Sequence, residues 1–204
     1  MNEKEMRHFV FEVRAENNEQ YGDFITGRPI VYNSRTDIGG FDEIIEAGAL
    51  DNADLRDVRF LVNHNTDMIP LARSRNNNAN STMQMSIDGD GMNIRVNLDT
   101  ENNTDAKNLY SAIKRGDIDG MSFMFTVDSD SWDALESEHP TRHINKIGKV
   151  FEVSAVTFPA YPETTISARA AETLESARAT LESAKRSGEN IEVERLKAII
   201  KTKI

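Results

Sequence analysis

The segment at residues 83–98 reads MQMSIDGDGMNIRVNL and indicates how most of the chain folds. Apolar and polar residues alternate on both sides of the DGDG stretch at residues 88–91, which is the pattern of two strands that each bury one face. In the second run the residues expected to share the buried face are Met92, Ile94, Val96 and Leu98. Because aspartate and glycine favour a tight turn, the segment predicts a β-hairpin.

The same alternation predicts further strands along the first 166 residues. They are expected at HFVFEVRA (8–15), RFLVN (59–63), MSFMFTVD (121–128) and KVFEVSAVTF (149–158). A polar and acidic stretch at residues 128–148 separates the last two strands. We expect this stretch to be a surface excursion.

Two helices are expected among these strands. The segment NNTDAKNLYSAIKRG (102–116) carries Asn103 or Thr104 as a cap, and Gly116 stands where a C-terminal glycine belongs. The segment FDEIIEAG (41–48) predicts a short helix that ends at Gly48.

The composition shifts near residue 164, which predicts a domain at residues 1–166 and a helical tail at residues 167–204. The tail repeats TLESAR as TLESAK seven residues later, and its heptad seam consists of Leu174, Ala177, Leu181 and Ala184. A second amphipathic helix, with Ile191, Leu196, Ile199 and Ile200, is expected after Gly188. The tail is either a helix docked on the domain, or an arm that binds a helical partner or is removed by cleavage.

Composition limits the classes of function. The formal net charge is −10, which argues against general nucleic-acid binding because affinity for phosphates comes mainly from Lys and Arg. The absence of cysteine excludes disulfides, zinc–thiolate sites and cysteine nucleophiles. No run resembles a signal peptide or a membrane span. We therefore expect a soluble intracellular protein without a membrane or nucleic-acid partner.

Three of the predicted strands place a chemically capable side chain among apolar residues. They offer a hydroxyl at Ser122, an imidazole at His64 and a carboxylate at Glu152. Histidine can accept and return a proton near neutral pH, and a carboxylate can orient it. These are the components of a hydrolase triad, whose members are defined by geometry and not by chain order.

Each member taken singly has an ordinary alternative. Ser122 fits a surface serine, His64 fits a packed histidine, and Glu152 fits a salt bridge with Lys or Arg. Asp117 and Asp119 compete with Glu152 for the third role because they lie closer to the serine in sequence.

A metal-dependent hydrolase or nuclease using His64, Asn65 and Asp67 is a further alternative. The chain lacks a second histidine or a carboxylate pair at ligand spacing for such a site. We expect no metal and no cofactor.

The segments LVNHN (61–65), IKRGDIDGMSFMF (113–125) and VFEVSAVTFPAYP (150–162) resemble the prohead maturation proteases of tailed bacteriophages. The resemblance covers about residues 8–166, and these proteases look related in fold to the herpesvirus assemblins. Two departures from the usual family wording are Ala72 and Arg73 after a Pro-Leu pair, and Phe123 after the serine. The resemblance implies an α+β fold with a closed or nearly closed antiparallel β-barrel flanked by helices.

The resemblance also implies roles and partners. Ser122 would be the nucleophile, His64 the general base and Glu152 the residue that orients the histidine. The protein would act in the host cytoplasm, inside the assembling prohead, as a homo-oligomer such as a dimer. Its substrates would be the scaffold, the scaffolding segment of the major capsid protein and the protease itself. The main rival is a noncatalytic capsid scaffold or assembly chaperone that keeps the protease fold.

Overall fold

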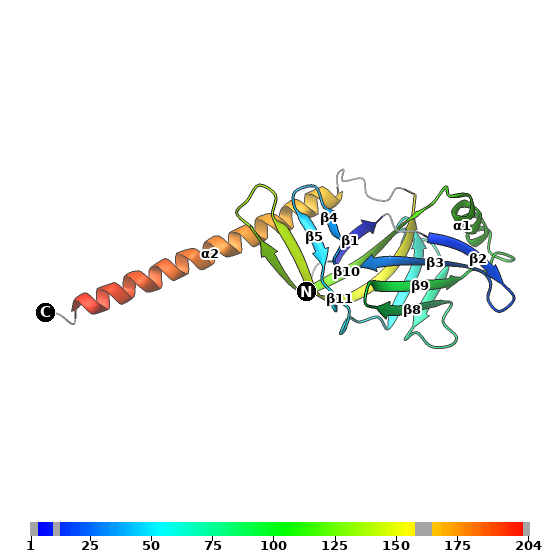
Figure 1. Cartoon of the computed structure of the whole chain (residues 1–204), viewed down its shortest axis with the longest axis horizontal. Coiled ribbons are helices and arrows are strands. Elements are labelled where there is room, and N and C mark those ends of the chain that lie inside the picture. The colour runs from blue at the N-terminus through cyan, green and yellow to red at the C-terminus, as the bar shows by residue number, and fades with distance from the viewer. Residues whose placement is uncertain (1–3, 10–12, 158–164, 202–204) are drawn as a thin grey trace. The chain divides into compact units, whose positions relative to one another are not determined.

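A computed structural model describes residues 4–9, 13–157 and 165–201 of the chain. The elements in these ranges are β1 (Lys4–Phe9), β2 (Val13–Asn18), β3 (Gly22–Val31), β4 (Arg35–Asp37), β5 (Asp42–Ile45), β6 (Asp57–Val62), β7 (Ala72–Arg75), β8 (Met83–Asp88), β9 (Gly91–Asn97), α1 (Thr104–Arg115), β10 (Gly120–Asp133), β11 (Thr141–Val156) and α2 (Thr165–Lys201) (Figure 1). Neither helix in these ranges is long and apolar enough to cross a membrane.

The strands form two sheets, which confirms the mixed α+β prediction. A seven-stranded sheet follows the order β1-β10-β11-β5-β4, with β6 paired to β11 and β7 paired to β6. A four-stranded sheet follows the order β2-β3-β9-β8. The predicted closed or nearly closed barrel is wrong. The 16-residue β11 pairs with β10, β5 and β6, so the larger sheet branches at this strand and does not return to its first edge.

The hairpin predicted at residues 83–98 is confirmed. Strands β8 and β9 pair antiparallel from Met83 opposite Val96 to Asp88 opposite Gly91. Gly91 has a φ of 139°, and a Cβ there would lie 2.0 Å from the carbonyl oxygen of Ile30, so only glycine fits. All four residues expected on the buried face of the second run are buried.

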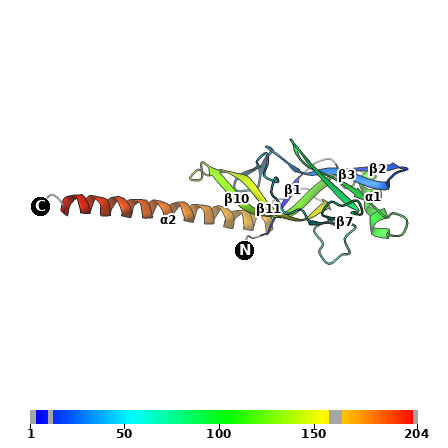
Figure 2. The same ribbon diagram turned by 90° about the horizontal axis from the view of Figure 1, so that it is seen from below.

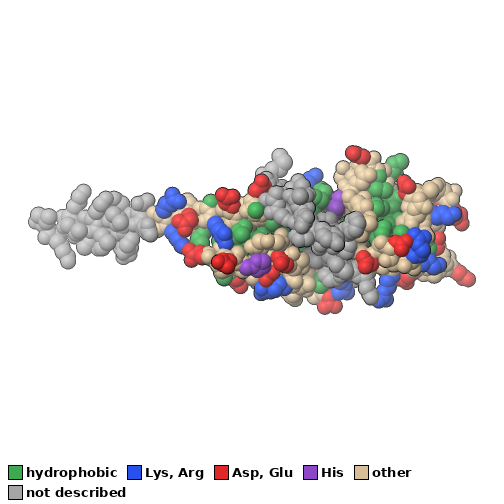
Figure 3. Space-filling view, turned by 90° about the horizontal axis from the view of Figure 1, so that it is seen from above, with side chains coloured by type: hydrophobic (Ala, Val, Ile, Leu, Met, Phe, Trp, Pro, Cys, Tyr) green, Lys and Arg blue, Asp and Glu red, His purple; other side chains and the backbone are tan. Residues whose placement is uncertain are grey.

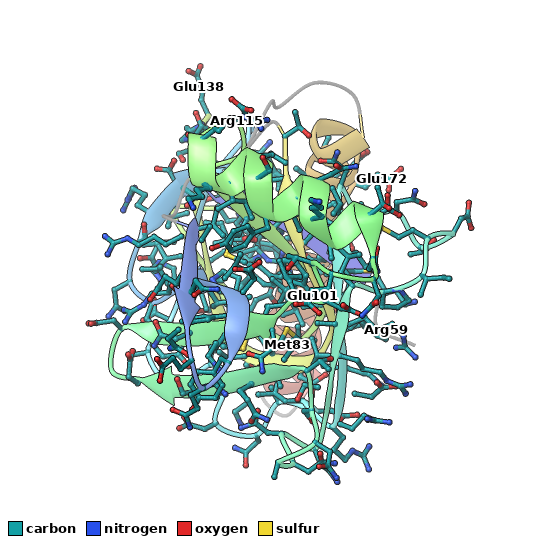
Figure 4. The ribbon with its side chains drawn as sticks, turned by 90° about the vertical axis from the view of Figure 1, so that its right-hand side faces the viewer. Arg59, Met83, Glu101, Arg115, Glu138 and Glu172 are labelled. Carbon is teal, nitrogen blue, oxygen red and sulfur yellow. The ribbon has the colours of Figure 1, made fainter. Side chains whose placement is uncertain are left out.

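The helix predicted at residues 102–116 is also confirmed. The Asn103 side chain accepts hydrogen bonds from the first backbone N–H groups of α1, and Gly116 closes its last turn in the left-handed conformation. Leu109 and Ile113 are buried in the core that α1 shares with the strands. In Figure 4, α1 crosses in front of the strands, with Arg115 at its C-terminal end, and Met83 is fully buried.

The helix predicted at residues 41–48 is wrong, because Asp42–Ile45 is the strand β5. Its side chains alternate in burial, with Glu43 and Ile45 inside. Glu43 is 2% exposed and forms ion pairs with Arg7 and Arg142. Tertiary pairing thus overrides the local helical pattern. Gly48, with a φ of 84°, lies in the turn that follows.

The acidic stretch at residues 128–148 is not a surface excursion throughout. Strand β10 continues to Asp133 and β11 begins at Thr141, so strands occupy most of it. Arg142 donates a hydrogen bond of 2.7 Å to Asp130 across the two strands. Cross-strand charge pairs of this kind let a polar sequence extend a sheet.

The chain divides into two compact units. The first comprises residues 1–36, 43–131 and 142–161, and the second comprises residues 37–42, 132–141 and 162–204. Within the second unit, Phe41 and Ala170 belong to one apolar cluster with Ile38 and Leu174, and Trp132 packs against it. The tail therefore shares its unit with two inserts from the strand-rich region, and the predicted boundary at residue 166 stays a prediction.

The tail forms one helix, α2, where two were expected (Figure 2). The helix continues through Gly188 because a single glycine in a helix costs only about 1 kcal/mol relative to alanine. Along the heptad seam Leu174 is buried, Leu181 is half-buried and Ala184 is exposed. The apolar side chains expected from Ile191 onward lie outside the described side chains.

Candidate active site

His64 lies on a strained turn directly after β6. Asn63 and His64 have φ values of 50° and 55°, a left-handed conformation that side-chain-bearing residues rarely adopt. The turn is bonded to the end of β11, where the Asn63 backbone N–H donates to the Ala155 carbonyl oxygen over 2.9 Å. The Asn63 amide also donates to the Thr157 hydroxyl over 3.0 Å and accepts from the Thr157 backbone N–H over 2.9 Å. These bonds keep the imidazole at a defined place beside β11.

The imidazole of His64 contacts the carboxylate of Glu152. Nδ1 of His64 and Oε1 of Glu152 are 2.6 Å apart, and the side chains are 12% and 4% exposed. A carboxylate accepts hydrogen bonds, so a neutral imidazole in this pair carries its proton on Nδ1 and has its lone pair on Nε2. Nε2 is itself buried. The geometry therefore selects the tautomer that a general base needs.

Ser154 completes the surroundings of Glu152. It lies two residues after Glu152 on β11, on the same face, and is fully buried. Its hydroxyl donates to Oε2 of Glu152 over 2.5 Å and accepts from the His64 backbone N–H over 3.1 Å. No role was predicted for Ser154 from the sequence. The two-residue spacing on one strand face was the available signal.

Ser122 lies on β10, which neighbours β11 in the sheet. It is fully buried, and its backbone pairs with His8 of β1. Its hydroxyl donates to the carbonyl oxygen of Arg7 over 2.6 Å. A hydroxyl has a single proton, so a hydrogen bond from Ser122 to His64 would replace the one to Arg7.

A buried cluster of charges anchors β1 next to Ser122. Arg7 pairs with Glu43 and Glu5, and Arg142 donates to Glu5 over 2.7 Å and to Asp130 over 2.7 Å. Burial would raise the pKa of Glu5, but hydrogen bonds and charge from Arg142 and Arg7 hold that pKa below its usual value. The cluster holds in place the strand whose carbonyl oxygen accepts the hydrogen bond from Ser122.

The two competing aspartates lie elsewhere. Asp117 pairs with Arg115, and both side chains are more than half exposed. Asp119 is exposed as well. Of the three carboxylates considered, Glu152 is the one that the structure brings to His64. Arg73 is also exposed, and its hydrogen bonds lower the pKa of Asp57.

A hollow of about 420 Å³ opens beside the His64 turn. It lies between the segment after β6 and one face of α1, and its lining is mostly apolar with a few polar groups: Val62, Asn65, Met68, Asp105, Asn108, Leu109, Ala112 and Ile118. Val62 and Asn65, which stand on either side of the Asn63–His64 turn in the chain, both line this hollow.

Metal-ligating side chains gather at a different place. In the part of the chain that the structure describes, the one group able to hold an ion is Asp37, Asp42 and His139, in the second unit. Among the described residues, neither His64 nor Asp67 belongs to a group of three His, Asp or Glu side chains that could hold an ion. The face drawn in Figure 3 mixes acidic and basic side chains.

His64 is oriented by the buried Glu152 of β11, and the neighbouring strand β10 carries the buried Ser122, so the sheet holds the three side-chain types of a serine hydrolase triad. Residues 9–178 match the model of the family described as caudovirus prohead serine protease, and the chain belongs to this family. Membership implies a serine protease that serves capsid maturation in the assembling prohead, with capsid proteins as substrates. A search of curated proteins finds no match to the chain, and a search of solved structures finds none.

Proposed function

We propose that the protein is a serine endopeptidase with Ser122 as nucleophile, His64 as general base and Glu152 as the group that orients the histidine. Its substrates would be the scaffold, the scaffolding segment of the major capsid protein and its own chain, and its active form would be a homo-oligomer such as a dimer. The hydrogen bond of 2.6 Å between His64 and Glu152 carries this proposal. It supplies a base in the correct tautomer in a family of serine proteases.

The chemistry follows the serine hydrolase scheme. The Ser122 oxygen attacks the carbonyl carbon of the scissile peptide bond while its proton passes to Nε2 of His64. The C–N bond then breaks, the leaving amine takes that proton, and an acyl ester remains on Ser122. Water hydrolyses the ester by the same proton transfers, which restores the hydroxyl and releases a carboxylic acid. The hollow beside His64 is suited to a substrate side chain next to the scissile bond.

Co-expression with the cognate capsid protein tests the function directly. Wild-type protein is expected to shorten the capsid protein and its own tail, and mass spectrometry identifies the new termini. Ser122→Ala should leave both chains intact, because it lacks the attacking oxygen. Identical masses in both cultures would contradict the proposal.

A noncatalytic scaffold or assembly chaperone is the second candidate. One observation favours it: Ser122 is fully buried, and its hydroxyl donates a hydrogen bond to the Arg7 carbonyl oxygen. This candidate predicts that Ser122→Ala supports capsid assembly as well as the wild type, with no new termini in either culture. The same co-expression therefore separates the two functions.

Replacing Glu152 by glutamine removes the charge that stabilises the imidazolium but keeps the side-chain volume. We expect kcat to fall below that of the wild type but to stay about 10- to 100-fold above the kcat of Ser122→Ala. The measurement is the rate of peptide cleavage, with Asp117→Asn and Asp119→Asn as matched controls. If Glu152→Gln were fully active while either aspartate variant were inactive, the third member of the triad would be assigned wrongly.

A further inference from the structure

We infer that Ser154 is a positioning residue that holds the His64 imidazole and the Glu152 carboxylate in the relative position that their hydrogen bond needs. The inference rests on the proposed function and assigns a fourth side chain to the same site. Its basis is that one hydroxyl contacts both members of the pair, the carboxylate of Glu152 and the backbone of His64.

The hydroxyl of Ser154 first fixes the carboxylate. Oε1 of Glu152 accepts from the imidazole and Oε2 accepts from Ser154, so each oxygen of this buried group has a donor. A buried carboxylate oxygen without a donor is costly, and a carboxylate held through one oxygen can rotate about its terminal bond. Two donors therefore set the plane in which Oε1 meets Nδ1.

The same hydroxyl also fixes the backbone of the histidine. His64 has a φ of 55°, and its N–H donates to Ser154. A left-handed residue keeps this conformation only where the surroundings hold it. The bonds between Asn63 and Thr157 hold the turn one residue earlier, but they do not contact the carboxylate. The Ser154 hydroxyl thus links the strained backbone of His64 to the carboxylate of Glu152.

The test compares Ser154→Ala with Ser74→Ala. Ser74 lies on β7, is equally buried and accepts a hydrogen bond from the Asn77 backbone N–H. It therefore matches Ser154 in burial and in accepting a backbone N–H, but it lies outside the site. All variants are made in two backgrounds. The active background gives kcat and KM, and a Ser122→Ala background gives intact protein for NMR of the Nδ1 proton of His64.

We expect Ser154→Ala to lower kcat on the order of 10- to 100-fold with KM within about twofold, the effect of one lost hydrogen bond to a charged group. In the Ser122→Ala background, the low-field resonance of the His64 Nδ1 proton should move upfield or exchange faster with solvent. Ser74→Ala should change neither kcat nor this resonance. An unchanged resonance and unchanged kcat in Ser154→Ala would overturn the inference.

The NMR arm separates this inference from the proposed function. If no variant, including the wild type, cleaves peptide but Ser154→Ala still shifts the resonance, then the enzyme proposal fails and the positioning role stands. If Ser154→Ala does not fold, the Ser122→Ala protein alone provides the test. A slowly exchanging Ser154 hydroxyl proton near the His64 amide proton is expected there, and its absence would refute the bond.

Discussion

Ser122→Ala and His64→Ala are each expected to lower the rate of peptide cleavage on the order of 10⁴- to 10⁶-fold. The first removes the attacking oxygen. The second removes the group that accepts its proton, so the serine stays a weak nucleophile. The losses should not add in the double variant, because either change alone disables the same step.

Purified protein with a peptide from the capsid scaffolding segment gives these rates, and a fluorophosphonate probe reports serine reactivity independently of substrate. Labelling should occur in the wild type and vanish in Ser122→Ala. Ser131→Ala, an exposed serine on the same strand β10, and His139→Ala, an exposed histidine, are matched controls that should keep activity and labelling. Undiminished cleavage by Ser122→Ala would assign the nucleophile to another residue.

The second large effect is on stability. Arg142→Ala removes one cation from the buried cluster and leaves Glu5 and Glu43 with less compensation. Removing one partner from a buried ion pair typically costs about 3–5 kcal/mol, because the remaining charge stays buried. We expect this loss in the free energy of unfolding, measured by urea denaturation in the Ser122→Ala background to prevent self-digestion.

Arg56→Ala is the matched control, since Arg56 forms an exposed pair with Asp54 and its loss should change stability little. The pH dependence gives a further check. Because the folded-state pKa of Glu5 lies below its ordinary 4.5, its contribution is present at neutral pH and is lost as the pH falls through that lower value. The difference in the free energy of unfolding between wild type and Arg142→Ala should therefore become smaller at acidic pH. A difference that grew in acid would contradict this account.

Much of the site could be predicted from sequence because strand periodicity is local. The alternation in MSFMF and VFEVSAV predicts which side chains share a face, and Ser122 and Glu152 each lie on the strand expected. The choice among Glu152, Asp117 and Asp119 could not be made in this way. It depends on which strand lies beside the histidine turn, and the pairing of β6 with β11 decides it.

The sequence by itself determined the hairpin at residues 83–98 and helix α1, because turn residues, caps and periodicity act over a few neighbours. Only the tertiary structure decided that residues 42–45 form a strand, since the partners of Glu43 are Arg7 and Arg142, far away in the chain. The tertiary structure also decided that the larger sheet branches at β11, and that Ser154 joins Glu152 to the His64 backbone. These features depend on contacts between distant segments, which local patterns do not encode.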